Sequence, residues 1–210
     1  MKKYSILTLI MALALCSSQG ATAQGNKEAN KLAREGAEAS KNQDYDKAVD
    51  LLRKATNLDH KYAPDLAAVY QGRAYAFAKN QQFREAIQDY DEALKLKADD
   101  ARIYEQRAAV EMKMYDYDKA LSDYSEIIKL KPNDPRYYNY RAYIYETKGD
   151  LKNSMADTEK VLKLDPNNAE AKARKTRLEQ RQASSLELTP PPSTPSSSPK
   201  ASPKHRRKQP

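Results

Sequence analysis

The sequence predicts an all-α fold, a right-handed superhelical solenoid of four helical hairpins followed by a capping helix. Three observations lead to this prediction. One helical pattern recurs every 34 residues, small residues repeat at two positions of each copy, and tyrosine or leucine repeats between them. A single hairpin of this kind cannot bury its apolar face alone, so the copies are expected to stack on one another.

The period is clearest in one column of small residues. Ala86, Ala120 and Ser154 follow one another at intervals of 34 residues, whereas Ala48 precedes Ala86 by 38 residues. The difference corresponds to about one helical turn, and the additional residues fall at 62–65. The second hairpin is therefore expected to begin one turn early.

Paired helices are expected to form the hairpins. They are residues 26–41 with 45–58, 64–79 with 83–96, 101–114 with 117–130, and 135–148 with 151–164. Residues suited to end a first helix in the left-handed conformation are Asn42, Asn80 and Gly149. Residues suited to cap the next helix are Asp44, Asp116 and Asp150, and Asp134 precedes a proline at a first helical position. A polar helix over 168–184 is predicted to cap the stack.

Small residues mark the place where the two helices of each hairpin cross. They are Gly36, Ala74, Ala108 and Ala142 on the first helices, and Ala48, Ala86, Ala120 and Ser154 on the second. Only small side chains allow two helix backbones to approach closely, and bulky residues then fill the spaces on either side. Tyr70, Tyr104 and Tyr138 occupy one such bulky column.

With these columns the chain resembles the tetratricopeptide repeat (TPR) family. The resemblance covers residues 29–168 and the capping helix, with repeats at about 29–62, 67–100, 101–134 and 135–168. It rests on small residues at repeat positions 8 and 20, aromatic residues at positions 4, 11, 17 and 24, and Pro132 and Pro166 near position 32. The chain departs from the family pattern at His60 and Ala98, which replace that proline.

A second periodic feature is a charged pair. Position 7 is arginine and position 23 is aspartate in the last three copies, which gives Arg73 with Asp89, Arg107 with Asp123, and Arg141 with Asp157. The first copy has Glu35 and Leu51, so both members change together. These positions face each other across an antiparallel hairpin, which favours a partly buried ion pair over a ligand-binding arginine.

The resemblance implies a concave groove, lined by the first helices, that binds a protein or peptide partner. The candidate groove residues are Gln71, Tyr75, Lys79, Arg102, Glu105, Lys113, Arg136, Asn139, Tyr143 and Arg177. Tyrosine and arginine often anchor interfaces, although a solvated face with tyrosines chosen for packing is the alternative. The family's clamp for a chaperone's C-terminal carboxylate is absent, because its positions hold Gln71, Tyr75, Gln106, Arg136 and Tyr140.

The first 23 residues have the order of an export signal. Lys2 and Lys3 precede an apolar run at 6–15 and small residues at 21–23, and that run is too short to span a bilayer. We therefore expect a periplasmic or secreted protein of a bacterial envelope. An outer-membrane lipoprotein anchored through Cys16 is the alternative, which the bulky Leu15 disfavours.

The C-terminal segment, residues 185–210, is predicted to be a disordered tail rich in proline and serine. Its basic residues are Lys200, Lys204, Arg206, Arg207 and Lys208. They and the two signal lysines account for most of the net charge of +8, which leaves +1 for residues 24–188. An alternative function is therefore attachment to an anionic cell-wall or membrane surface through the tail, and a merely solubilising end is the simpler interpretation.

The remaining residues favour an interaction scaffold over an enzyme. Outside the signal the chain has two histidines, His60 and His205, and no cysteine, so no metal-ligand spacing exists. No nucleophile–histidine–acid order or glycine-rich phosphate loop is present. The nearly neutral body argues against nucleic acid, despite its many tyrosines. We expect no catalytic residues, cofactor or small-molecule substrate.

Overall fold

The computed structural model describes residues 24–187, and every regular element within that range is a helix. The first helix is described over 24–41. It is followed by α2 (Tyr45–Leu58), the 3-10 helix η1 (His60–Tyr62), α3 (Ala63–Lys79), α4 (Phe83–Leu96), α5 (Ala101–Lys113), α6 (Tyr117–Leu130), α7 (Pro135–Thr147), α8 (Leu151–Leu164) and α9 (Ala169–Glu187). The predicted export signal at 1–23 and the basic residues of the predicted tail lie outside the described range.

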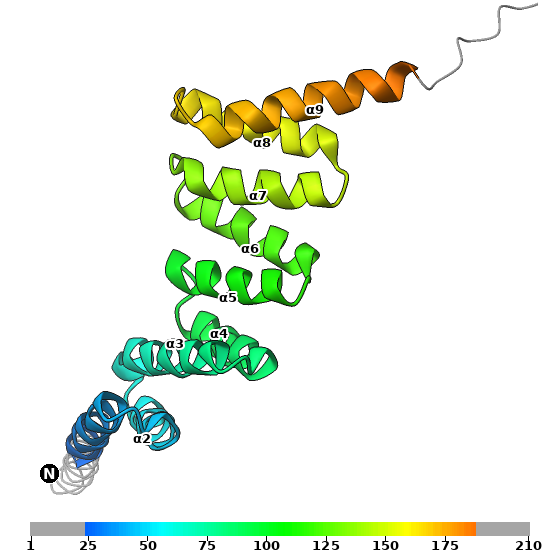
Figure 1. Ribbon diagram of the computed structural model, residues 1–210. Coiled ribbons are helices and arrows are strands. Elements are labelled where there is room, and N and C mark those ends of the chain that lie inside the picture. Colours follow the sequence, from blue (N-terminus) through cyan, green and yellow to red (C-terminus); the bar gives the residue numbers. More distant parts are fainter. Residues whose placement is uncertain (1–23, 188–210) are drawn as a thin grey trace, which may run out of the picture.

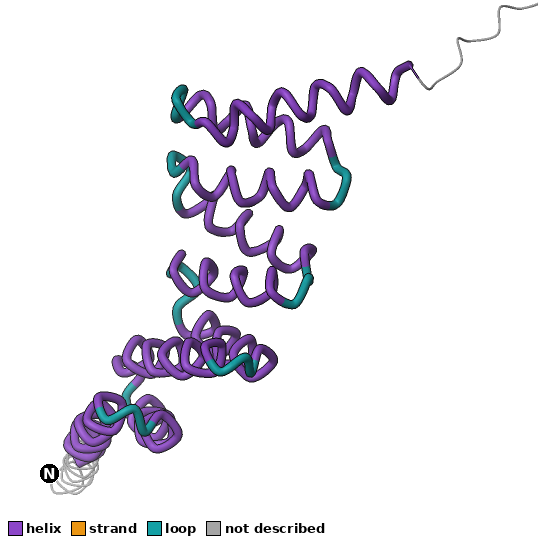
Figure 2. The backbone as a smooth tube through the Cα atoms, viewed as in Figure 1, coloured by secondary structure: helices purple, strands orange, loops and turns teal. Residues whose placement is uncertain are grey.

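The helices stack as hairpins in chain order (Figure 1). Within the hairpins, α3 packs on α4, α5 on α6, and α7 on α8; between hairpins, α4 packs on α5, α6 on α7, and α8 on α9. Short loops join the helices (Figure 2). This arrangement confirms the predicted all-α solenoid with a capping helix.

The predicted early start of the second hairpin is confirmed. Helix α3 has 17 residues, whereas α5 and α7 have 13 each. Pro64 lies in the first turn of α3, where a missing backbone N–H removes no helical hydrogen bond.

Each first helix ends in the same left-handed turn. In the four hairpins, the residues with positive φ are Gln43, Gln81, Tyr115 and Gly149, respectively. The predicted left-handed residue is therefore correct for Gly149 and wrong for Asn42 and Asn80. Asn80 keeps a nearly helical backbone (φ −85°, ψ 9°), and the reversal occurs at the next residue. There Gln81 N–H donates to the Ala78 carbonyl (3.2 Å) and Gln82 N–H to the Phe77 carbonyl (2.9 Å), which satisfies two terminal carbonyl groups.

Most of the predicted N-caps form. The carboxylates of Asp44, Asp134 and Asp150 each accept a hydrogen bond from a backbone N–H of the following helix. Asp116 occupies the cap position of α6, but its carboxylate makes no cap bond and pairs with Lys119 at 2.8 Å. The lysine ammonium group therefore competes there with the backbone donors.

Small residues fill the helix crossings, as predicted. Ala74 and Ala86, Ala108 and Ala120, and Ala142 and Ser154 are fully buried. A Cβ atom added at Gly36 would lie only 2.8 Å from Cγ of Leu52. Ser154 adds a polar contact, because its hydroxyl donates to the Ala142 carbonyl across the hairpin (2.9 Å).

The three predicted Arg–Asp pairs are present, each with two hydrogen bonds. Their lengths are 2.7 and 2.8 Å for Arg73 with Asp89, 2.9 and 2.6 Å for Arg107 with Asp123, and 2.7 and 2.9 Å for Arg141 with Asp157. Each guanidinium also lies 5.6–5.8 Å from the ring centre of the position-4 tyrosine in its own repeat. The position-7 arginines are thus held by the fold.

Helix α9 covers the last hairpin and continues to Glu187, beyond the predicted end at 184. The first proline of the tail is Pro190, so the sequence contains no strong helix-breaking residue between 184 and 187. Its buried residues include Ala171, Arg174 and Leu178. Among residues 24–187, no helix combines the length and apolar character that crossing a bilayer requires.

Candidate functional site

Two adjoining hollows lie along the first helices of the second to fourth hairpins. The α3–α5 hollow has a volume of about 580 Å³ and is lined by Tyr75, Ala78, Lys79, Gln81, Phe83, Tyr90, Gln106, Ala109, Val110 and Lys113. The α5–α7 hollow has a volume of about 440 Å³ and is lined by Glu105, Ala109, Met112, Tyr124, Asn139, Tyr140, Tyr143 and Glu170. Ala109 lines both, so together they form one groove, called the groove below.

The α3–α5 hollow has an aromatic lining with lysines beside it. Tyr90 is almost fully buried, whereas 59% of Tyr75 is exposed. Burial raises the pKa of Tyr90 to about 12, so this phenol stays neutral at physiological pH. The ammonium group of Lys113 lies 5.8 Å from the ring centre of Phe83. Lys79 and Lys113 are the last residues of α3 and α5. A positive charge there interacts favourably with the negative end of the helix dipole.

The α5–α7 hollow is lined by tyrosines and acidic residues. Tyr124 and Tyr140 stack with ring centres 5.3 Å apart and an interplanar angle of 26°. Tyr143 is 49% exposed. The Glu105 carboxylate accepts a hydrogen bond from the Tyr137 hydroxyl (3.0 Å), which fixes one side of the hollow.

Six of the ten candidate groove residues line these hollows: Tyr75, Lys79, Glu105, Lys113, Asn139 and Tyr143. Gln71 instead donates from Nε2 to Gln106 Oε1 (2.6 Å) and ties α3 to α5. The other three, all arginines, fold back onto carboxylates of their own chain.

Arg102 and Arg136 bind the N-cap aspartates of their own helices. Arg102 lies 3.2 Å from Asp100, and Arg136 lies 2.7 Å from Asp134. Each guanidinium holds the pKa of its aspartate below the usual range. Neither arginine lines the α3–α5 or the α5–α7 hollow, so these two residues support the ends of helices in the unbound chain.

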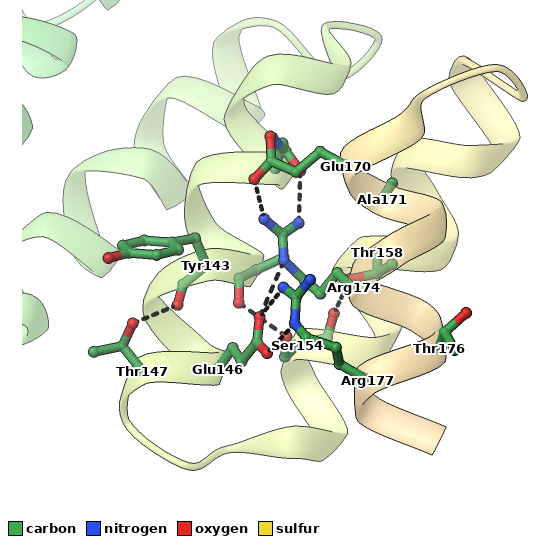
Figure 3. Close-up of polar contacts among 12 residues, drawn as sticks. Tyr143, Glu146, Thr147, Ser154, Thr158, Glu170, Ala171, Arg174, Thr176 and Arg177 are labelled. Carbon is green, nitrogen blue, oxygen red and sulfur yellow. Dashed lines mark hydrogen bonds and ion pairs between the residues drawn. The ribbon is translucent and has the colours of Figure 1, made fainter. Parts of the chain in front are cut away.

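Arg177 belongs to an ion-pair cluster that attaches α9 to α7 (Figure 3). It pairs with Glu146 at 3.1 Å, and the fully buried Arg174 approaches the same carboxylate at 3.4 Å. Arg174 also donates to Glu170 and to Asn139, each at 2.6 Å. Through these bonds the cluster fixes two residues of the α5–α7 hollow.

Several of these residues were not predicted from the sequence. Arg174 lies in α9, outside the four aligned copies, so no column identified it. Tyr124 and Tyr140 stack on each other although they belong to different repeats. The alignment of repeat positions does not show which side chains of neighbouring repeats come into contact. Gln106 occupies a position of the carboxylate clamp, where its lack of charge indicates only that the clamp is absent.

A third hollow, of about 600 Å³, surrounds the Arg73–Asp89 pair on the side of α2 and α4. Its charged groups already have partners within the chain. Arg53 donates to the Tyr70 hydroxyl at 2.7 Å, and Lys95 lies 2.5 Å from Glu92. These internal contacts leave the groove as the better candidate.

Within residues 24–187, no cluster of histidine, cysteine or acidic side chains has a metal-binding arrangement. The groove offers aromatic surface, ammonium groups and carboxylates on a helical scaffold. Such a set suits the binding of an extended chain by contact and charge.

Two segments of the chain match models of known repeat families. Residues 72–114 match a family model described as a TPR repeat, and residues 135–168 match one described as a tetratricopeptide repeat. The second match has the same limits as the fourth predicted repeat. No curated protein sequence matches the chain significantly.

Solved structures of similar fold include eukaryotic and bacterial proteins. The TPR domain of Arabidopsis OM64 is 26% identical, with a TM-score of 0.50 over 56% of this chain and 98% of that one. The first TPR of Spaghetti (RPAP3), bound to the HSP90 peptide SRMEEVD, is 23% identical, with a TM-score of 0.51 over 57% of this chain and 95% of that one. A tetratricopeptide repeat protein from Parabacteroides merdae is 19% identical, with a TM-score of 0.57 over 77% of this chain and 62% of that one.

The stacked hairpins with small-residue crossings and the two family matches lead to one conclusion: this chain belongs to the tetratricopeptide repeat family.

Proposed function

We propose that the chain is a non-enzymatic adaptor that holds a segment of a partner protein in its groove. The observation that carries this proposal is where the exposed tyrosines lie. Four tyrosines of the described chain are prominently exposed, and three of them, Tyr75, Tyr140 and Tyr143, line the groove. Exposed aromatic residues gathered on one concave face are typical of interaction sites.

The dimensions and rigidity of the groove support the same proposal. Its two parts, of about 580 and 440 Å³, offer room for individual side chains of an extended segment. The tyrosines lie on packed helices, and each side chain has only two rotatable χ angles. Binding a partner therefore costs these side chains little conformational entropy. Spaghetti (RPAP3), which has a similar fold, is bound to a peptide in its solved structure.

Affinity capture from the native cells tests this proposal. The tagged chain is compared with a Tyr75→Ala/Tyr143→Ala variant and with Tyr115→Ala, because Tyr115 is 77% exposed and lines neither part of the groove. We expect one partner set to remain with Tyr115→Ala and to be lost with the double variant. Retention of the same set by all three folded proteins would exclude the groove as the site.

We further propose that the adaptor works in the bacterial envelope, on the basis of the signal-like residues 1–23. The basic residues between 200 and 208 support a second candidate function, attachment to an anionic surface. Cell fractionation of the full chain and of a chain ending at Leu188 separates the two functions. If the tail anchors the protein, the full chain should stay with the membrane or cell-wall fraction at low salt and be released at high salt, whereas the truncated chain should be soluble. Equal soluble fractions of the two chains at low salt would exclude anchoring.

A further inference from the structure

The linings of the two parts of the groove differ in the sign of their charged residues. The α3–α5 hollow is lined by two lysines and no acidic residue, whereas the α5–α7 hollow is lined by two glutamates and no basic residue. A bound segment therefore experiences a change of sign along its length, which favours one charge order over the reverse.

Lys79 and Lys113 differ from the other cations near the groove. In the described part of the chain, neither lysine forms an ion pair, and the ammonium group of Lys113 lies over the Phe83 ring. Arg102, Arg136 and Arg177, in contrast, are each paired with a carboxylate of the chain. The two lysine charges are thus available to a ligand.

Aromatic surface lies directly beside these charges. Tyr75, Phe83 and Tyr90 line the same hollow as the lysines. An aromatic or long aliphatic side chain can pack against these rings while neighbouring carboxylates meet the ammonium groups.

We propose that the α3–α5 hollow binds an acidic–aromatic motif of a partner protein. In this motif, an apolar side chain enters the hollow, and aspartate or glutamate residues next to it pair with Lys79 and Lys113. The inference rests on the proposed adaptor function and names the partner chemistry. The motif does not need a chain terminus, because Gln71 and Gln106 bond to each other at 2.6 Å and the chain lacks the carboxylate-clamp pattern.

The acidic lining of the neighbouring hollow sets the charge order. The Glu105 carboxylate accepts a hydrogen bond from the neutral Tyr137 hydroxyl and would repel further carboxylates in the α5–α7 hollow, whereas Glu170 is paired with Arg174 at 2.6 Å. The acidic residues of the motif are therefore confined to one end. The following part of the partner segment is neutral or basic and lies toward α7.

Fluorescence anisotropy with a defined peptide tests the inference. The probe is a labelled, amide-capped peptide with one phenylalanine flanked by glutamates, followed by neutral residues. It is compared with a peptide that has glutamine in place of each glutamate. We expect the glutamate peptide to bind more tightly and to lose its advantage as salt is added.

The matched variants are Lys79→Gln/Lys113→Gln and Lys119→Gln/Lys129→Gln. Both lower the net charge by two, but Lys119 and Lys129 pair with Asp116 and Glu126 and line neither hollow. We expect the first variant to weaken binding of the glutamate peptide roughly two- to thirtyfold, as the loss of two partly exposed ion pairs implies. The control variant should bind as the unaltered chain does.

Three results would overturn the inference: no binding of the glutamate peptide, equal affinity for both peptides, or equal weakening by both variants. These results are distinct from failure of the adaptor function. If affinity capture still depends on Tyr75 and Tyr143, the groove binds a partner of different chemistry. If capture does not depend on them, the proposed function fails as well.

Discussion

Arg107 and Asp123 face each other across the α5–α6 hairpin and share two hydrogen bonds, 2.9 Å from Nε and 2.6 Å from Nη2. The remaining nitrogen, Nη1, donates to Asp91 of the preceding repeat at 2.5 Å. Arg141 likewise reaches Ser125 of the preceding repeat (3.0 Å), and Arg73 reaches Asp46 (2.6 Å). In each of the last three repeats, one arginine therefore stabilises its own hairpin and connects it to the hairpin before it.

Removing the charge of Arg107 should destabilise the chain strongly. Asp123 is 2% exposed, so Arg107→Met would leave a buried carboxylate without its ion pair. We expect a loss of about 3–5 kcal/mol in the free energy of unfolding, measured by urea denaturation. Lys119→Met, which breaks an exposed pair, should cost about 0–1 kcal/mol. Equal losses in the two variants would contradict a structural role for Arg107.

Glu111 should make the stability depend on pH. It is 2% exposed, and one of its carboxylate oxygens lacks a hydrogen-bond partner. Burial, assisted by the nearby Asp123 carboxylate, raises its pKa from 4.5 to about 8. Between these values the unfolded chain releases this proton more readily than the folded chain, so the folded state loses stability as pH rises through the interval.

The control for this pH effect is Glu111→Gln. We expect it to gain stability relative to the unaltered chain as pH rises from 4.5 toward 8, measured by urea denaturation at several pH values. A stability difference that is constant over that interval would show that Glu111 does not titrate between the two states.

The helix crossings should not tolerate a larger residue. Ala120 is fully buried where α5 and α6 cross, so Ala120→Leu would force the helices apart. We expect a loss of about 1–3 kcal/mol in the free energy of unfolding, measured by denaturation. Ala173→Leu, at an exposed position of α9, is the control and should change stability little. Unchanged stability of the Ala120→Leu variant would show that the repeat register is wrong.

The attachment of α9 should depend on Arg174. This side chain is fully buried and reaches Glu146 and Glu170 (Figure 3). It also donates a hydrogen bond to Asn139. In hydrogen exchange, Arg174→Met should speed exchange of α9 amides more than that of α3 to α6, because local opening requires only the contacts of α9 to break. Arg181→Met, on an exposed part of the same helix, is the control. Equal exchange in both variants would contradict this role.

The sequence was sufficient for features that follow the 34-residue period. The columns of small residues identified the helix crossings, and the joint change at positions 7 and 23 identified the Arg–Asp pairs. The third hydrogen bond of each arginine was not predictable, because its acceptor differs between repeats: Asp46, Asp91 and Ser125.

The candidate groove was predictable in part. Repeat positions identified Tyr75, Tyr143 and the two lysines, because position along a helix determines the direction of a side chain. They did not show that Arg102 and Arg136 fold back onto Asp100 and Asp134, although the Asp-x-Arg spacing was visible. A flexible arginine side chain forms an ion pair with a nearby carboxylate, and the family pattern does not specify its rotamer.

The central claim, that the groove holds a partner, is tested most directly by site-specific photo-crosslinking in living cells. A photoreactive phenylalanine analogue replaces Tyr75, Tyr143 or Tyr115, which are exposed by 59%, 49% and 77%. Only the first two line the groove. Our account predicts that Tyr75 and Tyr143 crosslink to one common partner and that Tyr115 does not. Crosslinking of the partner from Tyr115 alone would contradict it.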